Sequence, residues 1–271
     1  MIQDVWRNFG FFCGCLRSFS ISESLTLSDK GYCVSTGNEF ENWVYYPEKI
    51  SDASSSHNGL FQAVNYPEKV SDVETVKKAM KFFAERCETF MWPVYDGGFD
   101  VLEEAGLVHA GHLEAMSLEP SRAVTKRVNP SVKFKAVTNH SLSDEWARCE
   151  WSAFEYGGST ESAAYKAYIA LARAFCDDER MLMYIAELDG IDAGAFLVTN
   201  EADMIGVYYF AAVPELRRKG IASSMMSEIC GLSKGRKIVL QATPSGVPFY
   251  ESFGFDDLGA MEVYSTTADI F

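Results

Sequence analysis

The chain has 271 residues, of which 48% are hydrophobic and 14% aromatic, and its formal net charge is −14 at pH 7. This composition excludes global disorder, and the acidic balance argues against nucleic acid as a partner, because phosphates require a basic face. No apolar run is long enough to span a membrane, while the length allows two domains.

Seven cysteines are scattered along the chain without C-x-x-C pairs, at positions 13, 15, 33, 87, 149, 176 and 230. An odd, dispersed set favours reduced thiols and therefore a cytoplasmic location. Cys13 and Cys15 are too close for the usual zinc spacings and the histidines are dispersed, so we assign no metal. The short apolar stretch that follows Asp4 and Arg7 is interrupted, which argues against a secretory signal.

The boundary between the two predicted domains is placed at the segment 119–130, which is polar, carries two prolines and lacks periodicity. The first domain is predicted over 1–125 and the second over 131–271. In the first domain, Phe90–Trp92 is predicted as a strand, and Ser71 and Glu74 have the S-x-x-E spacing of a helix capping box.

The second domain has clear periodicity and turn signals, and Asp189-Gly190 is a good hairpin turn. In chain order the predicted elements are a strand at 132–137, helices around 143–154 and 161–176, strands at 182–188, 193–199 and 205–212, a helix at 222–232, a strand at 237–242, a helix at 247–253 and a strand around 260–265.

The turn after the strand at 205–212 is the most informative stretch. Pro214 stops the strand, and Arg217, Gly220 and Ala222 then open a helix with the spacing R-x-x-G-x-A. Free backbone N–H groups and the positive end of the helix dipole meet at such a helix start, and glycine can adopt backbone angles closed to other residues. The stretch therefore predicts a pyrophosphate-binding turn.

This turn resembles motif A of the GNAT acetyltransferases, [RQ]-x-x-G-x-[GA], and Phe249–Phe255 resembles their motif B, F-Y-x-x-x-G-F. The two motifs stand in the family's order and spacing. The resemblance implies acetyl-CoA as cosubstrate and an α/β (α+β) fold, with a mixed, mostly antiparallel sheet flanked by helices. It also implies that the strands at 205–212 and 237–242 splay apart to admit the pantetheine arm.

The resemblance further implies site residues. Backbone groups of Ala211 and Val213 would bind the arm, and an amide near Ala211 would polarise the thioester carbonyl. The complete implied set for the cosubstrate is Ala211, Ala212, Val213, Arg217, Arg218, Lys219, Gly220, Ile221, Ala222 and Ser223. Tyr250 matches the tyrosine that many relatives use to protonate the departing thiolate; a phenol pKa near 10 keeps it neutral at pH 7. The alternative for Tyr250 is a packing role.

The acceptor site is expected at the first two helices of the second domain and the loop between them. Its expected lining is Glu145, Trp146, Trp151, Phe154 and Tyr208, with Glu155 and Tyr156. Core packing is the alternative for Trp146 and Trp151. The strand 204–212 carries no carboxylate, so no general base is assigned; Tyr208 or Tyr209 acting through water, or an amine that arrives deprotonated, are the alternatives.

Motif B has an ungapped echo 148 positions earlier in the chain, which predicts two similarly folded halves. The matching pairs are Gly246 with Gly98, Glu251 with Glu103, Gly254 with Gly106 and Gly259 with Gly111. Tyr250 falls on Leu102, and the phosphate turn falls on 69–74, where Ser71 and Glu74 would cap the helix. We therefore expect a degenerate GNAT-like first domain with a scaffold or regulatory role and no CoA pyrophosphate loop.

Taken together, the sequence predicts transfer of acetyl from acetyl-CoA to a primary amine, that of a small molecule, by direct attack in a ternary complex. One alternative is a catalytically idle acyl-CoA-binding sensor or partner-binding module; another is an N-acetyltransferase acting on a protein or peptide. The intact turn and Tyr250 favour the enzyme, and the missing acid before the turn favours the sensor. The oligomeric state does not follow from the sequence.

Overall fold

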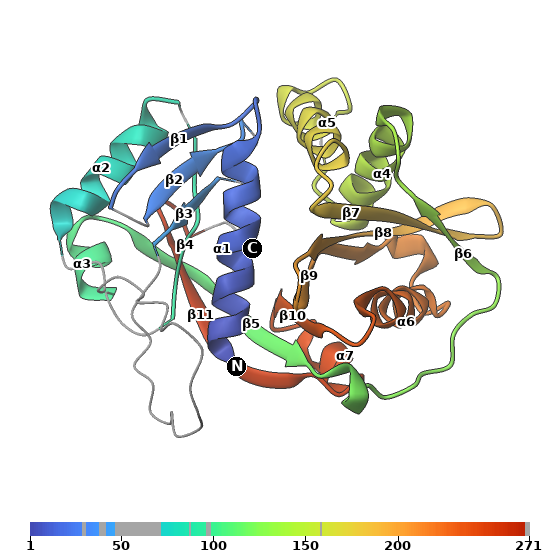
Figure 1. The fold of residues 1–271 in the computed structure, drawn as a ribbon. Helices are drawn as coiled ribbons and strands as arrows, with labels where there is room; N and C mark the ends of the chain where they lie inside the picture. The colour runs from blue at the N-terminus through green and yellow to red at the C-terminus, as the bar shows by residue number, and fades with distance from the viewer. Residues whose placement is uncertain are drawn as a thin grey trace. The chain divides into compact units, whose positions relative to one another are not determined.

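Figure 1 shows the computed structural model of the chain, which describes residues 1–28, 31–37, 42–46, 72–86, 88–95, 99–157 and 159–268. By backbone contacts these residues form two compact units. Unit 1 consists of Met1–Ser22 and Glu114–Gly259 with a short piece that begins at Thr36, and unit 2 contains the remaining described residues. Met1–Ser22, predicted within the first domain, thus packs with the second. The domain limits 1–125 and 131–271 stay a prediction.

Unit 1 contains one sheet with the strand order β5-β10-β9-β8-β7-β6. The only parallel neighbours among these described strands are β9 and β10, so the sheet is mixed and mostly antiparallel, as predicted. Its elements are α1 (Ile2–Ser18), the end of β5 (Val108–Leu118), β6 (Val132–Ala136), α4 (His140–Ala153), α5 (Ala163–Cys176), β7 (Met181–Leu188), β8 (Ile191–Asn200), β9 (Met204–Ala212), α6 (Ile221–Ser233), β10 (Lys237–Ala242), α7 (Val247–Glu251) and the start of β11 (Asp256–Ser265), with short 3-10 turns at Pro120–Arg122 and Pro214–Leu216.

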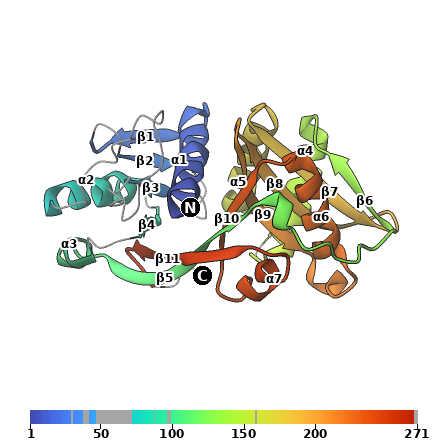
Figure 2. The same ribbon diagram turned by 60° about the horizontal axis from the view of Figure 1, so that its bottom comes forward.

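Helices cover both faces of this sheet. In Figures 1 and 2, α4 and α5 lie on one face of β7 and β8 and α6 lies on the other. The buried residues of α6 include Ile221, Met225 and Ile229, whose spacing of four puts them on one side of a helix, and they join the core with Phe196 and Val198 of β8. Within the described residues, no helix is both long and apolar enough to cross a bilayer.

The predicted elements of the second domain are confirmed with small shifts at their ends. The turn between β7 and β8 shows why: Asp189 and Gly190 have φ of 51° and 82°, and a two-residue hairpin turn with both residues in the left-handed region matches the twist of the flanking strands. Such turn and periodicity signals act over a few residues, so they are readable without the tertiary structure.

The helix α1 is an unexpected part of unit 1. It packs against β9 and β10, and its Phe12 ring stacks on Tyr208 of β9 with 4.1 Å between ring centroids. Polar bonds support the contact: Asp4 accepts from Lys237 at 2.6 Å and Arg7 donates to Asp203 at 2.7 Å. The first turns of the chain therefore complete the layer of helices over these strands.

Unit 2 is smaller and has its own core, which includes Phe83 stacked on Phe90 at 4.5 Å. Its elements are β1 (Glu23–Thr26), β2 (Tyr32–Ser35), β3 (Trp43–Tyr45), α2 (Val73–Ala84), β4 (Trp92–Val94) and α3 (Phe99–Glu104), together with the start of β5 and the end of β11. The strands β1, β2 and β3 form an antiparallel sheet, and β4 pairs with β11.

The internal repeat is confirmed as a local helix–glycine–strand unit. The helices α3 and α7 are both short, and the glycines after them, Gly106 and Gly254, have φ of 100° and 94°. The next pair, Gly111 and Gly259, has φ of 131° and 107°. A Cβ is disfavoured at such angles, which explains glycine in both copies. Gly98 lies outside the described residues.

The capping of α2 differs in one residue from the prediction. Asp72, rather than Ser71, is the N-cap: its Oδ1 accepts from the Glu74 N–H at 2.9 Å and its Oδ2 accepts from the Thr75 hydroxyl at 2.9 Å. Ser71 itself lies outside the described residues. A carboxylate therefore occupies the helix start that corresponds to the phosphate turn.

Candidate functional site

A gap opens between the parallel strands β9 and β10. Their pairing ends at Val207 and Leu240, although β9 continues to Ala212 and β10 to Ala242. Because both strands run toward their carboxyl ends here, the gap opens toward the turn that follows β9. This agrees with the predicted splay of the two strands.

A β-bulge in β9 accounts for the divergence. Leu197 pairs with Tyr208 and Ala195 with Ala211, so Tyr209 and Phe210 share one partner position on β8. Tyr209 has φ of 52°, a left-handed conformation that costs a non-glycine residue about 1–3 kcal/mol. Since a bulge bends its own strand and increases its twist, β9 turns away from β10 at this point.

The bulge also decides which backbone groups face the gap. The Val213 N–H donates to the Ala193 carbonyl at 2.9 Å, and by the alternation of an antiparallel ladder Ala211 faces β8 as well. This corrects the expectation that Ala211 and Val213 bind the pantetheine arm. Ala212 faces the gap, and its carbonyl accepts from Arg217 Nε at 3.2 Å.

The turn before α6 brings the predicted phosphate-binding residues together. Gly220 is the N-cap of α6 with φ of 80°, and no side chain caps the helix. Among the residues that the structure describes, no acceptor takes the backbone N–H groups of Arg218–Ser223. The helix start is therefore open at α6, whereas Asp72 closes it at α2.

The side chains of Arg217 and Asn129 stabilise the turn before α6 through hydrogen bonds. Arg217 donates to the Ala153 carbonyl and to Glu155, both at 3.1 Å, so its guanidinium fixes the turn to the end of α4. Asn129 donates from its side-chain Nδ2 to the Lys219 carbonyl at 2.9 Å, and its backbone N–H donates to Ser224 Oγ at 3.0 Å. No sequence signal indicated Asn129, which lies in the segment 119–130 that was predicted as the domain boundary.

Tyr250 lies on α7 beside the divergent end of β9. Its half-buried ring is 6.0 Å from that of Phe210 and 5.5 Å from that of Phe255. Burial raises the pKa of the Tyr250 phenol above its usual range, so the group is neutral at pH 7. No hydrogen bond joins its hydroxyl to another described residue, which leaves the proton available to a ligand.

The residues expected to line the acceptor site do not all converge. Trp146 is fully buried and donates from Nε1 to the Phe196 carbonyl at 3.2 Å, and Glu145 forms an ion pair with Lys135. Trp151 is also buried and donates to the Gly157 carbonyl at 3.0 Å. These side chains pack the core or pair with neighbours, which is the alternative that the sequence left open for the tryptophans.

Phe154 and Tyr208 are among the expected lining residues that keep accessible surface. Phe154 is 42% exposed, and its ring stacks on Tyr156 with 5.5 Å between centroids. Tyr208 is half-buried, and its hydroxyl donates to Asn8 Oδ1 of α1 at 2.8 Å. Tyr208 therefore sits under α1 at the closed end of the gap.

Sequence reasoning missed the buried carboxylate of Glu150. This residue of α4 is fully buried and accepts a hydrogen bond from the Tyr168 hydroxyl. Burial and the nearby carboxylate raise the pKa of Tyr168 well above its usual range. Glu150 stands next to Trp151 in a helix that carries other acidic residues, so nothing in the sequence distinguished it from an exposed carboxylate.

Comparison with known proteins agrees with this geometry. Residues 153–265, which include the open turn and Tyr250, match the model of the acetyltransferase (GNAT) domain. A search of curated protein sequences finds no match.

Solved structures resemble the fold over nearly the whole chain at low sequence identity. A GCN5-related N-acetyltransferase from Kribbella flavida is 12% identical with a TM-score of 0.60, over 96% of this chain and 95% of that one. A GCN5-related N-acetyltransferase from Sphaerobacter thermophilus is 13% identical with a TM-score of 0.58, over 87% and 76%. A tandem GNAT protein from the clavulanic acid biosynthesis pathway is 13% identical with a TM-score of 0.57, over 96% and 87%. Residues 153–265 therefore match the GNAT acetyltransferase domain, and the fold of nearly the whole chain is similar to that of solved GNAT structures.

Proposed function

We propose that the protein transfers the acetyl group of acetyl-CoA to a primary amine of a small molecule, by direct attack in a ternary complex. The observation that carries the proposal is the open start of α6 next to the gap between β9 and β10. The free N–H groups of Arg218–Ser223 suit a pyrophosphate, because helix starts combine unpaired donors with a positive dipole end. Arg218 and Lys219 add positive charge to an otherwise acidic chain.

The gap would hold the pantetheine arm as a further extended segment beside β9. The Ala212 N–H, which faces the gap near its open end, is a backbone donor placed to bind the pantetheine arm. The acceptor amine attacks the carbonyl carbon, the new C–N bond forms, and the C–S bond breaks to release the thiolate. Holding the two reactants together can contribute about 7–11 kcal/mol to the lowering of the barrier.

Tyr250 is proposed to stabilise the departing thiolate. A thiol has a pKa near 8.5 and a phenol near 10, and burial moves the Tyr250 pKa further up. Complete proton transfer to the thiolate is thus uphill, so the phenol acts mainly by donating a hydrogen bond as negative charge develops on sulfur. The proton lost by the amine leaves to solvent or to a base that we do not assign.

A sensor that binds acyl-CoA without turnover is the second candidate, and the absence of a carboxylate from β9 favours it. We also propose a reducing compartment such as the cytoplasm, since no disulfide joins the cysteines within the described ranges. A screen of small amines and peptides for release of free thiol from acetyl-CoA separates the enzyme from the sensor and the small-molecule acceptor from the peptide.

The proposed cosubstrate site is tested by Gly220→Glu. The added carboxylate would stand at the open helix start, take its N–H groups and repel phosphate. At about 1.5–3 kcal/mol for each hydrogen bond to a charged group, loss of two such bonds weakens acetyl-CoA binding at least about 100-fold in isothermal titration.

The matched control is Gly235→Glu. Gly235 has φ of 84°, close to the 80° of Gly220, and nothing lies within 4 Å of a Cβ added there. Gly235→Glu therefore imposes the same backbone strain at the other end of α6. Its affinity for acetyl-CoA should stay within about twofold of the wild-type value. Unchanged binding of acetyl-CoA by Gly220→Glu would refute the proposed site.

A further inference from the structure

The closed end of the gap between β9 and β10 is where the acyl group would lie, if the proposed function holds. The phosphate turn follows the carboxyl end of β9, so the arm enters from the open end and points toward Val207 and Leu240. From Val213 back to Tyr208 the strand covers about 17 Å at roughly 3.3 Å per residue. The thioester is the far end of the arm, and the residues just beyond the last strand pair therefore face the acyl group.

These residues are Tyr208 on β9 and Gln241 on β10. The Tyr208 ring is fixed on two sides by α1: it stacks on Phe12 at an interplanar angle of 12°, and its hydroxyl donates to Asn8 Oδ1 at 2.8 Å. A side chain with both its ring and its hydroxyl held in this way cannot swing aside at low cost.

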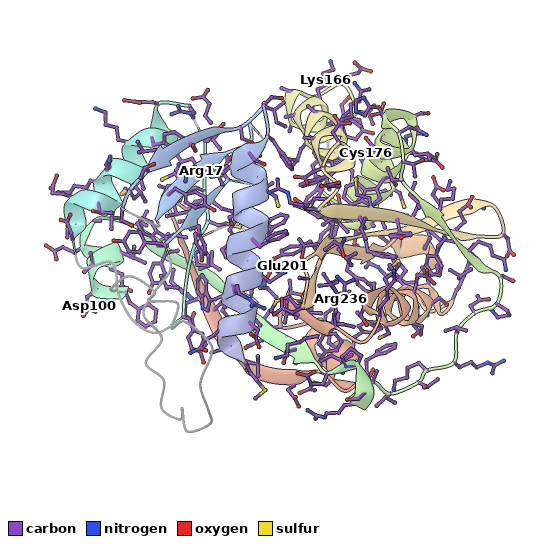
Figure 3. The ribbon with its side chains drawn as sticks, in the orientation of Figure 1. Arg17, Asp100, Lys166, Cys176, Glu201 and Arg236 are labelled. Carbon is purple, nitrogen blue, oxygen red and sulfur yellow. The ribbon has the colours of Figure 1, made fainter. Side chains whose placement is uncertain are left out.

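The side chain of Asn8 is itself held in place by burial and hydrogen bonds. It is fully buried, and its Nδ2 donates to Thr199 Oγ1 at 2.8 Å and to Glu201 Oε1 at 2.6 Å; Figure 3 shows Glu201 beside α1. Its amide lies directly over Gly206, where an added Cβ would be 2.5 Å from the Asn8 Cγ. The support for Tyr208 thus continues from α1 into β8 and β9.

The closed end is polar as well as rigid. The Gln241 side-chain nitrogen is buried beside the Tyr208 hydroxyl, and that hydroxyl donates to the Asn8 amide oxygen. An aliphatic chain longer than acetyl would need the space of the Tyr208 ring, and moving that ring would break its hydrogen bond to the buried Asn8 amide, which is unfavourable.

We propose that the closed end of the gap is an acyl pocket limited to acetyl, with Tyr208 as its floor and α1 as the element that holds the floor in place. Tyr208 faces the acyl group and determines specificity, whereas Asn8 and Phe12 are positioning residues. The N-terminal helix, far from the GNAT domain in sequence, is thereby part of that domain's cosubstrate site.

The test is the affinity of the full-length protein for acetyl-CoA, butyryl-CoA and malonyl-CoA, measured by isothermal titration without an acceptor. The wild type should bind acetyl-CoA at least tenfold more tightly than the other two. Tyr208→Ala removes the floor and should shift the butyryl-to-acetyl affinity ratio about 15-fold toward butyryl-CoA, the gain expected for two buried methylenes. Tyr184→Ala is the matched control, because it removes the same side chain from β7, where the ring stacks on Phe196, and should leave the ratio unchanged.

Three results would overturn the proposal: equal wild-type affinity for acetyl-CoA and butyryl-CoA, tighter binding of malonyl-CoA, or an unchanged ratio in a folded Tyr208→Ala protein. If circular dichroism shows that Tyr208→Ala does not fold, Phe12→Ala takes its place, since it removes the support and leaves β9 intact. A ratio shift of at least threefold toward butyryl-CoA in Phe12→Ala supports the pocket, and no shift overturns it. If the wild-type protein does not bind acetyl-CoA at all, the proposed function is wrong, and this inference fails with it.

Discussion

Replacing Gly206 by alanine should detach α1 from the GNAT domain, although it adds a single methyl group. Gly206 lies in β9 under the side chain of Asn8, and a Cβ there would overlap the Asn8 amide. Its backbone angles do not require glycine, since its φ lies outside the left-handed region. The glycine is needed only because Asn8 fills the place of its side chain.

The size of the effect follows from the bonds that Asn8 makes. Its amide donates to Thr199 and Glu201 and accepts from Tyr208. At about 1 kcal/mol for each hydrogen bond, with further cost for polar groups left buried, Gly206→Ala should destabilise unit 1 by about 3–5 kcal/mol. Asn8→Ala loses the same bonds and should cost about 3 kcal/mol. In the Asn8→Ala protein the new methyl group displaces no amide, so adding Gly206→Ala should lower the free energy of unfolding by less than about 1 kcal/mol.

The assay is hydrogen exchange of α1 and β9 peptides followed by mass spectrometry, which reports the local free energy of opening. Urea unfolding of the four proteins in the cycle gives the global values. A coupling of about 3 kcal/mol between the two substitutions is expected. Costs that simply add in the double variant would refute the reasoning, because they would show that Asn8 and Gly206 act independently.

Two further predictions concern single side chains. Tyr250→Phe should lower kcat by about 10–100-fold in the thiol-release assay with acetyl-CoA affinity unchanged; equal turnover removes Tyr250 from the mechanism. Burial raises the pKa of Glu201, so the folded protein holds this proton more tightly than the unfolded chain, and stability should fall as pH rises from about 4.3 through the raised value. Glu201→Gln, which keeps an acceptor for Asn8, should flatten that part of the pH profile in urea unfolding, whereas an unchanged slope would contradict the assignment.

The local features of this protein could be predicted from the sequence. The hairpin at Asp189-Gly190, the elements of the second domain and the open helix start at Gly220 each depend on residues within a few positions of one another. The repeat was readable for the same reason, because Gly106 and Gly254 meet the same backbone requirement in their own turns. Short-range sterics and hydrogen bonding determine such features, and they leave a direct mark on the order of residues.

Only the tertiary structure decided the environment of the site. Tyr208 and Asn8 are 200 positions apart, and nothing in the residues around either one indicates that they meet. Likewise, the bulge in β9 turned Ala211 and Val213 toward β8, and the position of α4 gave Arg217 the carbonyl of Ala153 as a partner. Such contacts arise from how whole helices and strands pack, so the periodicity of one segment predicts that it has a buried face but does not identify the segment that covers it.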